Sequence, residues 1–159
     1  MGYTHYWYRN EAGYTDADLF TAYFVFADMA KQIFETAKRQ GILLADKYGE
    51  TLNGETVDNG EVSFNGYADD AYETFTWYRE CPPAQPYMKD SRYFDCCKTA
   101  RKPYDAVVTA MLLAVKEAYG DAVTLESDGL PSEWEDGERL FEEATGNYAT
   151  VKFGPPISV

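Results

Sequence analysis

Histidine and cysteine are scarce in this chain of 159 residues, which has one His and three Cys. With His5 alone, two-histidine phosphoesterases and multi-histidine metal sites are excluded, and a Ser–His or Cys–His catalytic pair has to use this residue. The cysteines are Cys81 and the adjacent Cys96 and Cys97, so their number is odd and no Cys-x-x-Cys pair exists. This pattern argues against a disulfide framework or a zinc ribbon and favours a reducing cytoplasm.

Long apolar runs are missing too. No stretch approaches the ~20 apolar residues of a membrane span, and residues 1–7 lack the basic and apolar regions of a signal peptide. A Gly-rich phosphate loop, a Rossmann fingerprint and a nucleophile elbow are also absent. We therefore expect a cytoplasmic protein without a membrane partner and without a cofactor.

Positive charge is in deficit, because 27 acidic residues face 14 Lys and Arg and give a net charge of −13. Such a charge opposes direct binding to nucleic acid or anionic membranes. It permits binding to a basic host protein, as a DNA-mimicking inhibitor does, and it also fits an ordinary protein from an acid-biased genome.

Aromatic residues are abundant at 16% of the chain, with 14 Tyr. A Tyr ring packs while its hydroxyl reaches water or a ligand, so the surplus suits either a binding surface or a tyrosine-rich core boundary. The apolar fraction of 45% predicts one packed core, and we expect residues 1–159 to form a single domain.

Periodicity predicts the order of the elements. Alternation or β-propensity indicates strands over 3–9, 62–64, 74–78 and 123–127, and three- and four-residue apolar spacing indicates helices over 17–39, 103–120 and 137–145. Residues 41–60 show no regular pattern, and within them 48–54 are predicted as loop or short hairpin. Residues 81–86 are predicted as an extended loop leading to 94–97, and 150–153 as an edge strand. Gly129 and Gly137 are interpreted as turn glycines.

These elements predict an α+β fold with two layers. One antiparallel sheet would carry two long helices on one face, and the order βαββαβ matches the ferredoxin-like arrangement, with an extra C-terminal helix.

A basic segment breaks the acidic trend. Residues 89–102 hold five cations and two acids, and they precede the second long helix; the cations are Lys89, Arg92, Lys98, Arg101 and Lys102. Cations repel the positive end of a helix dipole, whereas free N–H groups together with Lys and Arg bind anions. The alternative is that these cations pair with acidic residues, which are plentiful in 126–143.

Three stretches resemble a group of small uncharacterised proteins encoded largely by tailed bacteriophages. They are residues 1–7 (MGYTHYW), residues 94–105 (FDCCKTARKPYD) and residues 127–129 (SDG) followed by Trp134. Asn65-Gly66 and residues 73–75 add to the resemblance. Those proteins usually read Phe-Cys where this chain has Cys96-Cys97. The resemblance implies a phage-type protein that acts inside a bacterial cell, and no activity comes with it.

Three functions stay open. The first is a non-enzymatic protein that binds a small anionic, nucleotide-like ligand; its expected contacts are Lys98, Thr99, Arg101, Lys102, Tyr104, Tyr3, His5 and Trp7. The second is an acidic inhibitor of a basic host protein, with a counter-defence role. The third is a small nucleotide-processing enzyme that uses His5, Cys97 or a metal held by loop acids, for which the candidates are Asp69, Asp70, Glu73 and Asp128.

Overall fold

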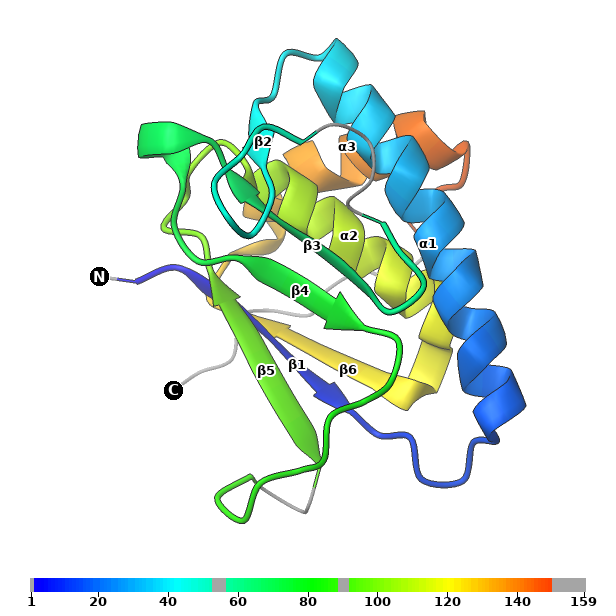
Figure 1. Ribbon diagram of the computed structural model, residues 1–159. Helices are drawn as coiled ribbons and strands as arrows, with labels where there is room; N and C mark the ends of the chain where they lie inside the picture. Colours follow the sequence, from blue (N-terminus) through cyan, green and yellow to red (C-terminus); the bar gives the residue numbers. More distant parts are fainter. Residues whose placement is uncertain (1, 53–56, 89–91, 150–159) are drawn as a thin grey trace.

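The computed structural model describes residues 2–52, 57–88 and 92–149. In these residues the chain forms an α+β fold of three α-helices and two three-stranded antiparallel sheets (Figure 1). The strands are β1 (Thr4–Arg9), β2 (Leu44–Ala45), β3 (Glu61–Gly66), β4 (Phe75–Tyr78), β5 (Tyr93–Lys98) and β6 (Val123–Ser127). The helices are α1 (Asp16–Arg39), α2 (Asp105–Tyr119) and α3 (Glu135–Thr145). The predicted edge strand over 150–153 lies outside the described residues.

The strands divide between two sheets, in the orders β5-β1-β6 and β2-β3-β4. The prediction of one ferredoxin-like sheet is therefore wrong. The error comes from β5, which was not predicted as a strand because Asp95 and Lys98 interrupt the alternation of its apolar residues. β5 pairs antiparallel with β1, Thr4 opposite Lys98, while β6 pairs with the other edge of β1, His5 opposite Ser127.

The first helix forms as its sequence predicts. Thr15 is its N-cap, and a capping box with Asp18 satisfies two backbone N–H groups at the start of the helix. Gly41 follows the helix with a φ of +79°, a conformation that glycine adopts without strain. The region after it contains β2 and a bridge between Ala45 and Thr51, so the expected short hairpin is present.

The three helices pack against one another, with α2 in contact with both α1 and α3. The third helix is therefore part of the core rather than an appendage. Gly137 belongs to this helix and is buried, so its interpretation as a turn glycine is wrong. A Cβ atom there would lie 1.9 Å from Thr109 Oγ1 of α2, and the close approach of α2 and α3 thus requires glycine.

Aromatic side chains join the two sheets. The Trp7 ring of β1 lies 5.4 Å from Phe75 and 6.2 Å from Trp77, both in β4. Arg9, 3% exposed, stacks over Trp77 and donates to the Tyr78 carbonyl. Rings on the inner face of β1 are therefore core residues.

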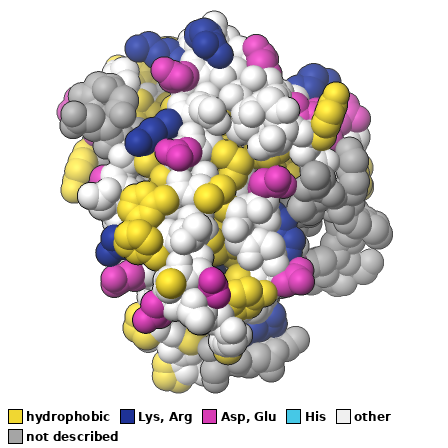
Figure 2. Space-filling view, turned by 90° about the vertical axis from the view of Figure 1, so that its right-hand side faces the viewer, with side chains coloured by type: hydrophobic (Ala, Val, Ile, Leu, Met, Phe, Trp, Pro, Cys, Tyr) yellow, Lys and Arg dark blue, Asp and Glu magenta, His cyan; other side chains and the backbone are white. Residues whose placement is uncertain are grey.

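The α1 side of the molecule carries patches of hydrophobic side chains between acidic and basic ones (Figure 2). Phe20 and Val25 of α1 are among the exposed apolar residues. None of the helices that the structure describes has the length and apolarity needed to cross a lipid bilayer.

Candidate functional site

The three sequence stretches that carry the phage resemblance meet at one end of β1. The backbone N–H groups of Thr99 and Ala100 donate to the Tyr3 carbonyl, at 3.0 and 3.3 Å. From the other side, the N–H of Asp128 donates to the Thr4 carbonyl at 3.0 Å. We call this place the three-segment junction: residues 3–7, 97–105 and 127–134.

A buried hydrogen-bond network occupies the three-segment junction. His5 is fully buried, with Nδ1 2.8 Å from Ser127 Oγ and Nε2 2.7 Å from Asp105 Oδ1. Thr99 Oγ1 donates to the same Asp105 oxygen at 2.6 Å. Neither Asp105 nor Ser127 was among the residues predicted from the sequence.

The partners of Ser127 fix the direction of these bonds. Its Oγ accepts the Gly129 N–H at 2.9 Å and the Trp134 Nε1–H at 3.2 Å. A hydroxyl has two lone pairs and one proton, so the Ser127 proton is left to point at His5 Nδ1. The Nε2–H of His5 then donates to Asp105. Each polar atom of the imidazole is satisfied within the protein.

The order Ser–His–Asp is that of a hydrolase triad, but the surroundings differ from those of a catalytic site. A catalytic serine needs an open approach to its oxygen for the substrate. Here Ser127 is 8% exposed, and its oxygen is occupied by Gly129, Trp134 and His5. The arrangement supports a structural role, joining β1, β6 and the start of α2.

The rings expected to stack on a ligand are all buried. Tyr3, Trp7 and Tyr104 are 1% exposed or less, so a planar ligand has no ring face to lie against at this place. Burial raises the pKa of the Tyr3 hydroxyl, and the charges of Asp105 and Glu133 raise it further. The Tyr104 hydroxyl donates to the Glu73 carbonyl at 2.7 Å.

Of the cations of the basic segment, Lys98, Arg101 and Lys102 each contact other groups of the protein, Arg92 contacts Asn10 and the Tyr8 ring near the other end of β5, and Lys89 lies outside the described residues. The Arg101 guanidinium stacks 4.2 Å over the Tyr3 ring and lies 3.4 Å from Glu133, while 58% of its side chain stays exposed. Lys102 Nζ donates to the Asp69 carbonyl at 3.1 Å, and Lys98 Nζ lies 5.7 Å from the Tyr72 ring centre.

The turn that carries these cations is conformationally unusual. Ala100 and Arg101 both have positive φ, at 51° and 57°, in the left-handed region that non-glycine residues rarely adopt. The turn redirects the chain from β5 into α2.

The candidates for enzyme chemistry are placed in unfavourable surroundings. Cys97 is fully buried, and its burial, followed by the charge of Glu73, raises the pKa of the thiol, the opposite of what an activated thiolate needs. Two of the four loop acids bind backbone N–H groups: Glu73 accepts the Lys98 N–H at 2.7 Å and Asp128 accepts the Thr4 N–H at 3.0 Å. In the described part of the chain, no three His, Cys, Asp or Glu side chains gather to hold a metal.

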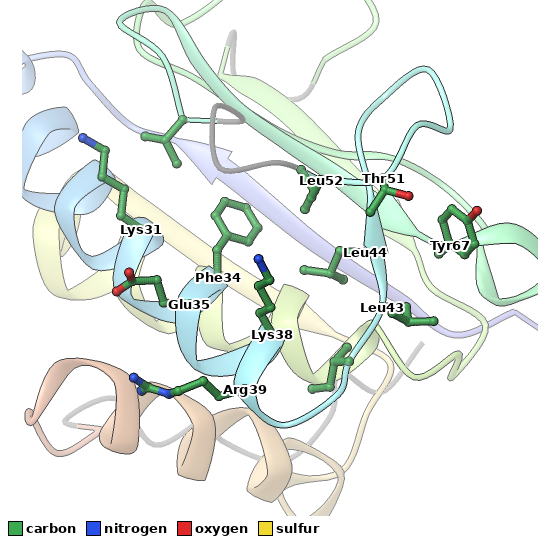
Figure 3. A pocket seen from close by; sticks show the side chains of 12 residues that line it. Lys31, Phe34, Glu35, Lys38, Arg39, Leu43, Leu44, Thr51, Leu52 and Tyr67 are labelled. Carbon is green, nitrogen blue, oxygen red and sulfur yellow. The ribbon is translucent and has the colours of Figure 1, made fainter.

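A cavity of about 710 Å³ lies on the other side of the fold, between the second half of α1, β2 and the segments around it (Figure 3). We call it the α1–β2 cavity. Its apolar lining consists of Phe34, Ile42, Leu43, Leu44, Leu52 and Val57. Phe34 makes an edge-on contact with Phe64 at 5.3 Å, so the floor of the cavity is continuous with the core.

Charged side chains of α1 surround this apolar floor. Lys31, Lys38 and Arg39 contribute three positive charges against one carboxylate, Glu35. Figure 3 shows Lys38 directed toward the space between Phe34 and Leu44, and Arg39 directed away from it. None of the three cations has a carboxylate within 4.0 Å among residues 2–52, 57–88 and 92–149. The sequence analysis missed this site.

No protein-family model, curated protein or solved structure matches the chain. The resemblance to phage-encoded proteins and the setting it implies therefore stay predictions. The candidate sites rest on their own geometry.

Proposed function

We propose that this protein is a non-enzymatic binding protein for a small organic anion, which it holds in the α1–β2 cavity. The observation that carries the proposal is an apolar cavity whose cations have no carboxylate partner within the described residues. Ligand sites are typically concave, mostly apolar and equipped with a few polar groups that orient the ligand, within a volume of roughly 300–1,000 Å³. At about 710 Å³, this cavity falls in that range.

The charge pattern supports an anion in particular. The chain has a net charge of −13, whereas the described lining of the cavity has three cations and one carboxylate, a local excess of two positive charges. Lysines beside an apolar surface, with no carboxylate within 4.0 Å among the described residues, interact with an anion more strongly than lysines in open solvent. A neutral or cationic ligand would gain nothing from them.

The cavity supports this function better than the basic segment does. At the three-segment junction an incoming anion has to compete with Glu133 for Arg101 and with the Asp69 carbonyl for Lys102. Within the described residues, the α1–β2 cavity requires no such exchange, because Lys31 and Lys38 are exposed and have no carboxylate within 4.0 Å. We therefore keep the predicted ligand class, a small anion, and assign it to another site.

A thermal-shift screen with paired variants tests the proposal. The panel holds alkyl carboxylates, alkyl phosphates, aromatic carboxylates, nucleotides and cyclic dinucleotides. A ligand at 100 times its Kd adds about 2.7 kcal/mol, which raises the Tm of a chain of this size by about 5–10 °C. Lys31→Glu combined with Lys38→Glu should abolish the shift.

Lys98→Glu combined with Arg101→Glu is the matched control, with the same change of charge at the site predicted from the sequence. Binding lost only in this control pair would refute the cavity and favour the basic segment. A flat screen would refute small-anion binding altogether. The acidic-inhibitor alternative then predicts salt-sensitive capture of a basic protein, lost when Glu133, Glu135 and Glu138 are neutralised.

A further inference from the structure

The shape and chemistry of the α1–β2 cavity narrow the class of anion, on the condition that the proposed function holds. Its charged groups all come from α1, whereas most of its apolar side chains come from the segment after that helix. Beyond the charged side chains of α1, the lining offers two hydroxyls, those of Thr51 and Tyr67. A nucleobase needs several donors and acceptors along its edge, and side-chain amides, the usual partners of such an edge, are missing from the described lining.

The apolar part of the lining is mainly aliphatic. Leu, Ile and Val side chains form most of it, with Phe34 already in edge-on contact with the core and Tyr67 at the margin. Such a lining accommodates a flexible alkyl chain, whose binding free energy grows with each methylene removed from water. It provides little of the flat aromatic surface on which a planar ligand stacks.

The charges indicate the size of the head group. Lys38 points toward the apolar space. Lys31 lies seven residues before it on α1, about two helical turns, and Glu35 lies between them in the sequence. Two lysines with one carboxylate nearby suit a single negative charge and leave a polyphosphate undercompensated.

We infer that the ligand of the α1–β2 cavity is a single-chain amphiphile with a monoanionic head, of the alkyl carboxylate class. The alkyl chain lies on Phe34, Leu44 and Leu52, and the carboxylate faces Lys38. The ligand is taken from solution rather than from a bilayer, because a protein of net charge −13 is repelled by an anionic membrane surface.

Calorimetric titration with hexanoate, octanoate, decanoate and dodecanoate, each kept below its micelle concentration, tests this class. Affinity should rise about tenfold for every two added methylenes until the cavity is filled. Octanol and octylamine are the matched probes without the negative charge, and both should bind at least about tenfold more weakly than octanoate. Leu52→Ser should flatten the dependence on chain length, whereas Leu130→Ser, an exposed leucine elsewhere, should not.

The two levels of the hypothesis fail differently. If some other anion binds and Lys31→Glu with Lys38→Glu abolishes that binding, but affinity does not depend on alkyl length, the amphiphile is refuted and the cavity function survives. If the longest chains bind equally well to the double lysine variant, the cavity function itself is refuted. Sedimentation with vesicles of phosphatidylglycerol should leave the protein in the supernatant, and co-sedimentation would overturn a ligand taken from solution.

Discussion

Ser127 offers the most direct test of the buried network, through the substitution Ser127→Ala. The change removes the oxygen that bonds His5 Nδ1, the Gly129 N–H and the Trp134 Nε1–H. A buried polar group that loses its partner costs about 1–3 kcal/mol. Even at the low end, His5 Nδ1 and the Gly129 N–H together predict a loss of about 2 kcal/mol.

That loss is large against the 5–15 kcal/mol that roughly bounds the stability of a domain. It should lower the Tm by about 4–8 °C for a chain of this length. Urea titration followed by circular dichroism at pH 7 measures it. Ser63→Ala is the matched control, since Ser63 is 5% exposed and its hydroxyl has no hydrogen-bond partner among the described residues. Equal stability of the two variants would refute the account of the network.

Three further predictions follow from single contacts. Gly137→Ala should destabilise the fold by about 1–3 kcal/mol in thermal melts, because the new Cβ would meet Thr109, even though alanine favours helices. Adding Thr109→Ala should recover part of the loss. A Gly137→Ala variant as stable as the wild type would contradict the close packing. Burial raises the pKa of the Cys81 thiol to about 11 and also raises the pKa of the Cys96 and Cys97 thiols. The native protein at pH 8 should therefore react slowly with Ellman's reagent at all three cysteines. Rapid labelling of Cys97 without unfolding would contradict its buried position. Burial also raises the pKa of Asp95 above its usual range, so the stability of the wild type relative to Asp95→Asn should be greatest below about pH 4 and fall as pH rises through the folded-state pKa. Urea titrations of both proteins across this pH range measure the difference, and a difference that does not change with pH would show that Asp95 is solvated.

Local signals predicted the helices well and the sheets only in part. The spacing of apolar residues located α1, and β6 runs over the same residues as predicted. β5 was missed because its polar residues mask the alternation. Its absence from the prediction left β1 without its partner and led to the wrong single sheet, since pairing between distant strands leaves no local trace.

The candidate site shows the same limit. β1 is the central strand of its sheet and carries rings on both faces, but nothing local says which partners these rings contact. Asp105 and Ser127 lie 100 and 122 residues from His5, so the network between them depends entirely on tertiary structure. The α1–β2 cavity combines ordinary lysines with residues of a segment predicted as loop. No local pattern in the sequence marks this cavity. Leu43, an apolar residue just after the end of α1, is 67% exposed, and only the structure shows this exposure.

The three-segment junction and the α1–β2 cavity differ in what a ligand must displace before it can bind. At the three-segment junction, His5, Ser127 and Asp105 already satisfy one another, and a ligand would have to break such bonds at about 1–3 kcal/mol each before it gained any. At the α1–β2 cavity, Lys31 and Lys38 are exposed beside the apolar floor, with no carboxylate within 4.0 Å among the described residues. A ligand that is apolar at one end and anionic at the other would remove apolar surface from water and pair a lysine, and both changes favour binding. The single histidine, His5, therefore belongs to a network that stabilises the fold. The proposed binding surface consists of lysines and aliphatic side chains, which are common residue types.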